Sequence, residues 1–324
     1  MERKGNLMSF RPDIKVFDAT VRDGGLVNNF FFEDDFVKEL YEANVKAGVD
    51  YMEFGYRAST EIFDEKDFGK WKFCKEEDIR EIVGENNTDL KIAVMADVGR
   101  TDLEDFLPKE ESVIDMVRVA TYVHQIPAAI EIIEHCHNLG YETTCNLMAI
   151  STATETEMQL ALELLGNSNV DVIYLVDSYG SLYPEQVHHL AEVYMQKANK
   201  FGKVTGFHAH NNQQLAFANT IEALSLGVSL LDVTMMGMGR GAGNCPAEAI
   251  VGFLKNPKFK LMPILKFVQE RMLPLKESGL VWGYDIPYLI TGMLNMHPRT
   301  AIAAESEKDT DYVEFYKTSW DKEC

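Results

Sequence analysis

The feature that most constrains the fold is a repeated alternation of strand-like and helix-like segments. Amphipathic stretches, such as residues 34–48, 126–140 and 184–200, separate short apolar runs, and several of them end in glycine, as helices often do. Strands that alternate with helices predict a parallel sheet, and eight such units in about 250 residues have the size of a closed (β/α)8 TIM barrel. An open doubly wound sheet is the alternative, although eight successive units favour closure. The apolar runs are residues 14–20, 50–56, 91–97, 115–122, 142–150, 171–177, 203–210 and 230–237.

The alternation of strand-like and helix-like segments also divides the chain into two parts. Residues 13–257 are predicted to form the barrel, and residues 258–324 a helical C-terminal extension. The interval 57–75 is too long for a plain βα loop, so we expect an insertion over the barrel mouth.

Composition limits the class of protein. The chain has 51 acidic and 31 basic residues and a net charge of −20, which repels phosphate backbones and anionic lipid. We therefore expect neither a nucleic-acid nor a membrane partner. The five cysteines form no CxxC pair, and neither a signal-peptide core nor an apolar run of 18 residues occurs. Reduced thiols and a cytoplasmic location are expected.

Polar residues collect where the predicted strands end, which is where TIM barrels carry their chemistry. Because the carboxyl ends of all the strands meet at one mouth, these side chains are predicted to line a single site. They are Arg22, Asp23, Glu53, Asp97, Arg118, Tyr122, Asn146, Asp177, His208 and His210.

The pair His208 and His210 predicts a metal site. Side chains two residues apart in a strand point to the same face, and imidazole is a good ligand for divalent transition metals. Asp23 follows the first strand, which neighbours the second and eighth strands in a closed barrel, and the seventh strand lies one further round, within reach of a loop residue. Two histidines with one aspartate leave positions open, as catalytic sites do. A local Arg22–Asp23 salt bridge in a tight turn, which Gly24 and Gly25 would permit, is the alternative.

Several motifs together are more specific. "RDGG" (22–25), "HAHNN" (208–212) and "GMGRGAGN" (237–244) resemble the metal-dependent aldolase and Claisen-condensing barrels, with an Arg–Asp motif on the first strand and a His-x-His on the seventh. The stretches 117–124, 174–180, 208–227 and 237–249 are most similar to the 4-hydroxy-2-oxovalerate aldolase branch.

The resemblance implies a set of roles. Asp23, His208 and His210 would bind Mn²⁺ or Mg²⁺, with Zn²⁺ or Co²⁺ as further possibilities, and Arg22 would hold the oxygen that becomes an enolate. Substrate contacts are expected from Ser178, Asn244 and Glu53, the last at the second strand end. The implied reaction cleaves or forms a carbon–carbon bond of a 4-hydroxy-2-oxoacid, from a small 2-oxoacid and an aldehyde.

One position departs from the aldolases. They carry a histidine, the base for the 4-hydroxyl, where this chain has Leu26, which cannot accept a proton. Tyr122, His124 and Tyr179 are the candidate replacements, and Tyr122 is the preferred one because it ends the fourth strand.

Other functions are weighed against the aldolase. An acyl-CoA Claisen transferase of the isopropylmalate or citramalate synthase kind is the main alternative, and helices like residues 288–299 would then cover a partner subunit's site. We expect a homo-oligomer through the C-terminal helices.

A biotin-dependent carboxyltransferase would need a carbamylated lysine at a strand end, and a hydroxymethylglutaryl-CoA lyase would need a cysteine where Met235 stands. A metal-binding scaffold without catalysis is the non-enzymatic alternative.

Overall fold

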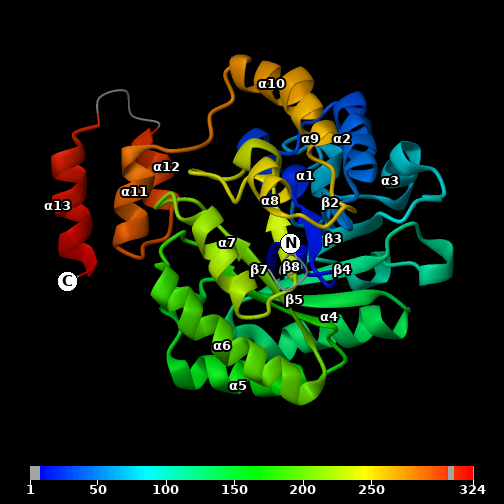
Figure 1. Cartoon of the computed structure of the whole chain (residues 1–324), viewed down its shortest axis with the longest axis horizontal. Coiled ribbons are helices and arrows are strands. Elements are labelled where there is room, and N and C mark those ends of the chain that lie inside the picture. Colours follow the sequence, from blue (N-terminus) through cyan, green and yellow to red (C-terminus); the bar gives the residue numbers. More distant parts are fainter. Residues whose placement is uncertain (1–7, 306–309, 324) are drawn as a thin grey trace, which may run out of the picture.

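The computed structural model, which describes residues 8–305 and 310–323, is a closed eight-stranded parallel barrel with strands in sequence order (Figure 1). The first and last strands pair in register from Lys15 opposite Leu230 to Asp18 opposite Val233, which closes the sheet. The predicted TIM barrel is therefore confirmed, and the open-sheet alternative is excluded. The strands are β1 (Lys15–Asp18), β2 (Tyr51–Tyr56), β3 (Lys91–Asp97), β4 (Met116–Thr121), β5 (Glu142–Leu147), β6 (Val172–Asp177), β7 (Val204–Ala209) and β8 (Leu230–Val233).

Helices surround the barrel. They are α1 (Thr20–Asn28), α2 (Asp34–Ala47), α3 (Glu76–Val83), α4 (Ile126–Asn138), α5 (Glu155–Gly166), α6 (Pro184–Phe201), α7 (Ala216–Ser225) and α8 (Ala247–Phe253).

The expected alternation is wrong after β3. Two 3₁₀ turns, Leu103–Asp105 and Lys109–Glu111, stand there in place of an α-helix. Pro108 lies between the two turns and would interrupt a helical hydrogen-bond ladder there, because it has no backbone N–H.

The barrel interior changes from apolar to charged along its axis. Eight buried apolar residues form a cluster of their own: Phe17, Tyr51, Ala93, Met116, Val172, Tyr174, Val176 and Leu230. Arg118, on β4, is fully buried, and its guanidinium carbon lies 4.0 Å from the Phe17 ring centre and 4.4 Å from that of Tyr174. A cation in this position is stabilised by the ring faces but also requires anions beside it.

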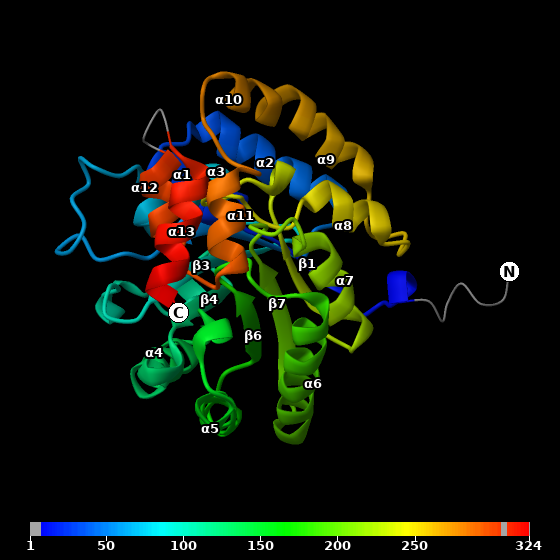
Figure 2. The same ribbon diagram turned by 90° about the vertical axis from the view of Figure 1, so that its left-hand side faces the viewer.

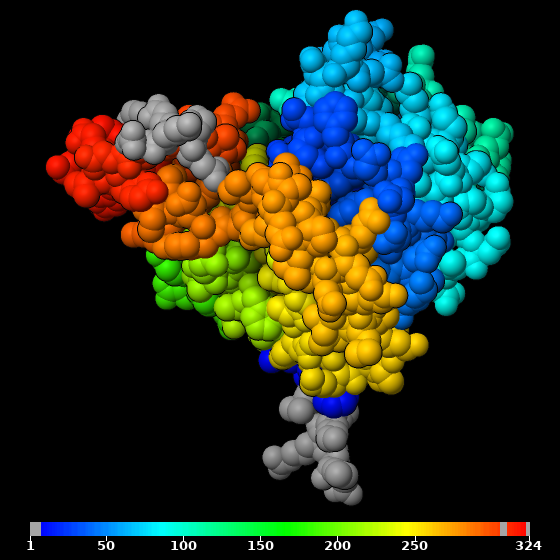
Figure 3. Space-filling model, turned by 90° about the horizontal axis from the view of Figure 1, so that it is seen from above, coloured from blue at the N-terminus to red at the C-terminus, as the bar shows by residue number. Residues whose placement is uncertain are grey.

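The C-terminal segment is helical, as expected. It contains α9 (Leu261–Phe267), a π-helical turn (Val268–Met272), α10 (Leu273–Glu277), α11 (Ile286–Met293), α12 (Arg299–Glu305) and α13 (Tyr312–Glu323). Helix α9 packs on α2, where the space-filling view shows the orange segment against the blue one (Figure 3). Helices α11, α12 and α13 form a group of their own (Figure 2).

This second group lies over loops at the carboxyl ends of the strands. Asn295 donates to the Ser151 carbonyl after β5 and bonds to Ser181 after β6, and Trp282 donates to the Met236 carbonyl after β8. The extension therefore contributes to the barrel mouth of its own chain. Among the described helices, none is long and apolar enough to cross a bilayer.

Candidate active site

Helix α1 begins directly after β1 and carries Arg22 and Asp23 into the barrel mouth. Both residues lie in buried positions near the start of the helix, so the predicted tight turn at Gly24 and Gly25 is wrong. These glycines are needed for close packing instead. A Cβ on Gly24 would lie 2.9 Å from the Met238 sulfur, and one on Gly25 would lie 2.1 Å from the Phe30 ring.

The carboxylate of Asp23 lies between the two histidines. Its Oδ2 is 3.3 Å from His208 Nε2 and 3.7 Å from His210 Nε2, and one ligand atom from each of the three residues lies within 4.8 Å of the others. All three side chains are buried. The same-face geometry expected of the histidine pair is present, and this Asp–His–His cluster could hold a metal ion.

Asp23 also has capacity left for a cation. Asn244 donates from Nδ2 to Asp23 Oδ2 at 2.7 Å, while Asp23 Oδ1 is buried without a hydrogen-bond partner. A buried carboxylate oxygen left alone is costly, and a bound cation would satisfy it. The donor set of one carboxylate and two imidazoles therefore fits a divalent ion.

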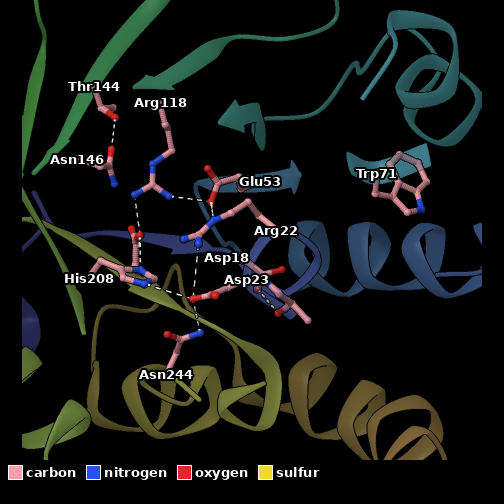
Figure 4. A network of polar contacts seen from close by, with 12 residues as sticks. Asp18, Arg22, Asp23, Glu53, Trp71, Arg118, Thr144, Asn146, His208 and Asn244 are labelled. Atoms are coloured by element: carbon pink, nitrogen blue, oxygen red, sulfur yellow. Dashed lines mark hydrogen bonds and ion pairs between the residues drawn. The ribbon is translucent and has the colours of Figure 1, made fainter. Parts of the chain in front are cut away.

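A network of ion pairs links the cluster to Arg118 and Glu53 (Figure 4). His208 Nδ1 lies 2.9 Å from Asp232 Oδ2, the same oxygen that accepts from Arg118 at 2.6 Å. Arg118 also donates to Glu53 at 3.0 Å, and Glu53 accepts from Arg22 Nε at 2.8 Å. Second carboxylates of this kind fix the tautomer and orientation of a metal-ligating histidine.

The protonation states of the residues in and beside this network follow from their positions. Burial favours the neutral form of Asp23, but Arg22 and the two histidines outweigh it and hold the pKa of Asp23 well below its usual range. Burial lowers the pKa of His210 to about 3, so this imidazole is neutral at pH 7 and can act as a ligand. For His208, burial is outweighed by Asp23 and Asp232, and its pKa is raised.

A small cavity of about 80 Å³ opens above the cluster. Arg22, Asp23, both histidines, Leu26 and Ser178 line it, together with Tyr56, Met95, Ala120, Asn146, Met148, Val176 and Arg240. Ser178 Oγ accepts from the Ala149 amide at 2.9 Å. Glu53 and Asn244 lie outside the lining, because their side chains bind Arg22 and Asp23 instead.

The predicted catalytic residue Tyr122 lies further out. It follows β4 and lines a second, outer cavity, and its ring stacks on His124 at 5.7 Å. Tyr179 packs edge-on against His297, with ring centres 5.5 Å apart.

Residues that the sequence did not single out also belong to the site. Asp232 lies within an apolar pattern that predicts core, and Arg240 lies within a glycine-rich pattern that predicts a loop. His297 comes from the C-terminal extension. Only Asp232 carried a usable signal, since a charged residue inside an apolar strand is rarely buried without a partner.

The fold and these residues define a class: a β/α barrel with a buried carboxylate–imidazole centre at the carboxyl ends of its strands. The HMGL-like family model matches residues 13–269, and the chain belongs to this family. The resemblance drawn from the motifs is thereby confirmed.

Known relatives are similar over most of the chain. An oxaloacetate decarboxylase of Mycobacterium tuberculosis is 29% identical over 74% of this chain and 69% of its own length. A 4-hydroxy-2-oxovalerate aldolase of Pelotomaculum thermopropionicum is 27% identical, covering 84% of this chain and 82% of its own. Both names describe lyases that break a carbon–carbon bond.

Among solved structures, the N-terminal domain of a candidate aldolase from Bacteroides vulgatus superposes with a TM-score of 0.77 at 25% identity, covering 93% of this chain and 99% of that one. The hydroxymethylglutaryl-CoA lyase of Pseudomonas aeruginosa, at 16% identity and a TM-score of 0.70, shares the fold.

Proposed function

We propose that the chain is a divalent-metal-dependent aldolase that cleaves or forms a carbon–carbon bond of a 4-hydroxy-2-oxoacid through a pyruvate enolate. The observation that carries this proposal is the convergence of Asp23, His208, His210 and Arg22 on one small cavity. The relatives named as aldolases support it.

The Asp–His–His cluster would hold the metal, with Mn²⁺ or Mg²⁺ as the proposed ion. Such a cation supplies Lewis-acid polarisation of a carbonyl oxygen.

Arg22 is placed to stabilise the enolate oxygen. Its Nε is occupied by Glu53 at 2.8 Å, which fixes the plane of the guanidinium and leaves N–H groups on its far side for the cavity. The two carboxylates beside Arg22 raise its pKa against the effect of burial, so its positive charge is permanent. A preorganised donor of this kind stabilises negative charge as it develops and is worth about 10² to 10³ in turnover.

Ser178 and the amide of Asn146 would orient the substrate, since both line the cavity. Thr144 donates to Asn146 Oδ1 at 2.7 Å, which leaves the Asn146 amide nitrogen as the donor for a ligand. Glu53 and Asn244 act through their neighbours, as positioning residues for Arg22 and Asp23.

Leu26 favours a second candidate, an oxaloacetate decarboxylase. This residue lines the inner cavity where the aldolases carry their base. Decarboxylation of oxaloacetate reaches the same enolate without removing a proton from a hydroxyl group, so it needs no base there. An acyl-CoA Claisen transferase stays an alternative, but Leu26 does not favour it, because formation of its enolate removes a proton from the acyl group and needs a base.

The experiment that tests the proposal is deuterium exchange at the methyl group of pyruvate, followed by NMR with and without Mn²⁺. We expect metal-dependent exchange in the wild type and a loss of about 10² to 10³ in Arg22→Lys, which keeps the charge but changes the planar fork. Arg80→Lys, on the outer helix α3, is the matched control and should exchange normally. Exchange that is absent, or unchanged in Arg22→Lys, would refute the role of the site.

Turnover of oxaloacetate and turnover of 4-hydroxy-2-oxovalerate, each measured on the same enzyme preparation, distinguish the decarboxylase from the aldolase. The cytoplasmic location and the homo-oligomer through the C-terminal helices stay predictions.

A further inference from the structure

An outer cavity of about 250 Å³ continues the inner one toward solvent. The two share five lining residues: Leu26, Tyr56, Ala120, Met148 and Arg240. A ligand anchored at the Asp–His–His cluster would therefore extend into this outer cavity with whatever it carries at its far end.

The outer cavity is lined by an excess of basic groups in a chain of net charge −20. Lys72 comes from the 57–75 segment, Arg100 from the loop after β3, Arg240 from the loop after β8, and Arg299 from α12. The one carboxylate in the lining, Asp97, lies 3.8 Å from Arg100. Segments far apart in the sequence thus bring three further cations to one place.

Lys72 is the most informative of these cations. The residue is 6% exposed and its side chain lies among aromatic rings, with Nζ 4.3 Å from the Tyr56 ring centre and 4.1 Å from that of Phe63. Within residues 8–305 and 310–323, no carboxylate comes within ion-pair distance of it. Burial lowers the pKa of Lys72, against the opposite effect of Asp97.

Arg240, which is half-buried, and Arg299, which is exposed, also line this cavity. Neither has an ion-pair partner among the described residues, and the Nε of Arg240 is buried without a hydrogen-bond acceptor. A buried cation is normally paired, because desolvation of an isolated charge is costly, so Lys72 is the cation of this cavity whose burial most favours a bound anion. His297, at the same cavity, has its pKa lowered to about 4 by burial and by these two arginines, so it adds no charge at pH 7.

We propose that this outer cavity binds an anionic group, a carboxylate or a phosphate, on the far end of the second substrate. This inference rests on the proposed function and specifies its substrate class: an acidic aldehyde, and a 4-hydroxy-2-oxoacid that bears a second anion.

In the cleavage direction the C4 hydroxyl loses its proton to a base, for which Tyr122 in the outer cavity is the proposed group, and the C3–C4 bond breaks. The bonding electron pair becomes the pyruvate enolate, which then takes a proton at C3. The aldehyde that remains in the outer cavity keeps the anionic group. Because that group is unchanged by the reaction, Lys72, Arg240 and Arg299 contribute to specificity.

The first test compares matched acceptors in condensation with pyruvate: butanal against succinic semialdehyde, and glyceraldehyde against glyceraldehyde 3-phosphate. We expect the wild type to prefer one anionic member by at least about tenfold in kcat/KM, as one charge-assisted contact provides. The pair that shows the preference identifies carboxylate or phosphate.

Lys72→Met, which keeps the length and apolar contacts in the aromatic cage, should lower this anionic-to-neutral ratio by about 10- to 100-fold. Arg299→Met, at an exposed position, should lower it as well and serves if Lys72→Met does not fold. Lys66→Met is the matched control, because Lys66 lies exposed on the same segment away from the cavity. Equal use of neutral and anionic acceptors by a wild type that exchanges the pyruvate methyl group would overturn the anion site and leave the proposed function standing.

A second test does not depend on turnover. The midpoint of thermal unfolding is measured in inorganic phosphate, in succinate and in chloride of the same ionic strength, for the wild type, Lys72→Met and Lys66→Met. Stabilisation by one of the two anions over chloride that Lys72→Met loses and Lys66→Met keeps supports the site. The same midpoint in all three salts for the wild type would overturn it, even if methyl exchange fails.

Discussion

The substitution Asp232→Asn tests a residue that holds His208 in place but is not itself one of the three proposed metal ligands. Asp232 Oδ2 accepts from both His208 Nδ1, at 2.9 Å, and Arg118, at 2.6 Å, so it places the Nδ1 proton of His208 and leaves Nε2 facing Asp23. An amide has the same size, but it can present an NH₂ group to Nδ1. The proton then moves to Nε2 and blocks the ligand atom.

The expected changes in metal affinity and in stability can both be given a magnitude. Loss of a carboxylate behind a metal-ligating histidine lowers metal affinity by about 10- to 100-fold, or about 1.4 to 2.7 kcal/mol. Breaking a buried ion pair costs about 3 to 5 kcal/mol of stability, and the lower figure applies here because Arg118 keeps Glu53 at 3.0 Å.

Titration with Mn²⁺ by calorimetry measures the first effect, and urea unfolding of metal-free protein measures the second. Asp171→Asn is the control, because Asp171 precedes β6 and accepts from the Thr143 amide near the start of β5, at the opposite end of the strands from the site. If Asp232→Asn binds Mn²⁺ as tightly as the wild type, the carboxylate does not set the state of His208 and the reasoning is wrong.

Three further predictions concern the site and its surroundings. Protein purified without chelator should hold about one divalent ion per chain by metal analysis, and the double variant His208→Ala, His210→Ala should hold none; retained metal would remove the site. Tyr122→Phe should reduce 4-hydroxy-2-oxovalerate cleavage more than pyruvate methyl exchange, whereas equal losses would make Tyr122 an orienting residue. Burial raises the pKa of Asp18 from 3.8 to about 6, so the protonated form is the stabilised one: its contribution is complete below pH 3.8 and is lost as the pH rises through 6. Asp18→Asn should therefore remove about 2 kcal/mol of the fall in unfolding free energy between pH 4 and 7.5, measured by urea titration, and an unchanged pH profile would contradict this assignment.

The sequence by itself determined the barrel and the innermost part of the site. Strand periodicity places His208 and His210 on one face, whatever surrounds them, and strand order brings Asp23 to the same mouth. These are local or topological consequences of spacing. One local error, a turn at Gly24 and Gly25, arose because glycine also occurs where two segments pack closely, as α1 does against Met238.

Tertiary structure alone decided what supports and surrounds that centre. Asp232, Arg118 and Glu53 come from three different strands, and their pairing depends on which side chains the barrel turns inward at the same level. The outer cavity combines Lys72 with Arg299, residues more than two hundred positions apart, through the fold of the C-terminal extension over its own barrel. No local pattern encodes such contacts, because the free energy of a buried charge depends on neighbours that only the folded chain brings together.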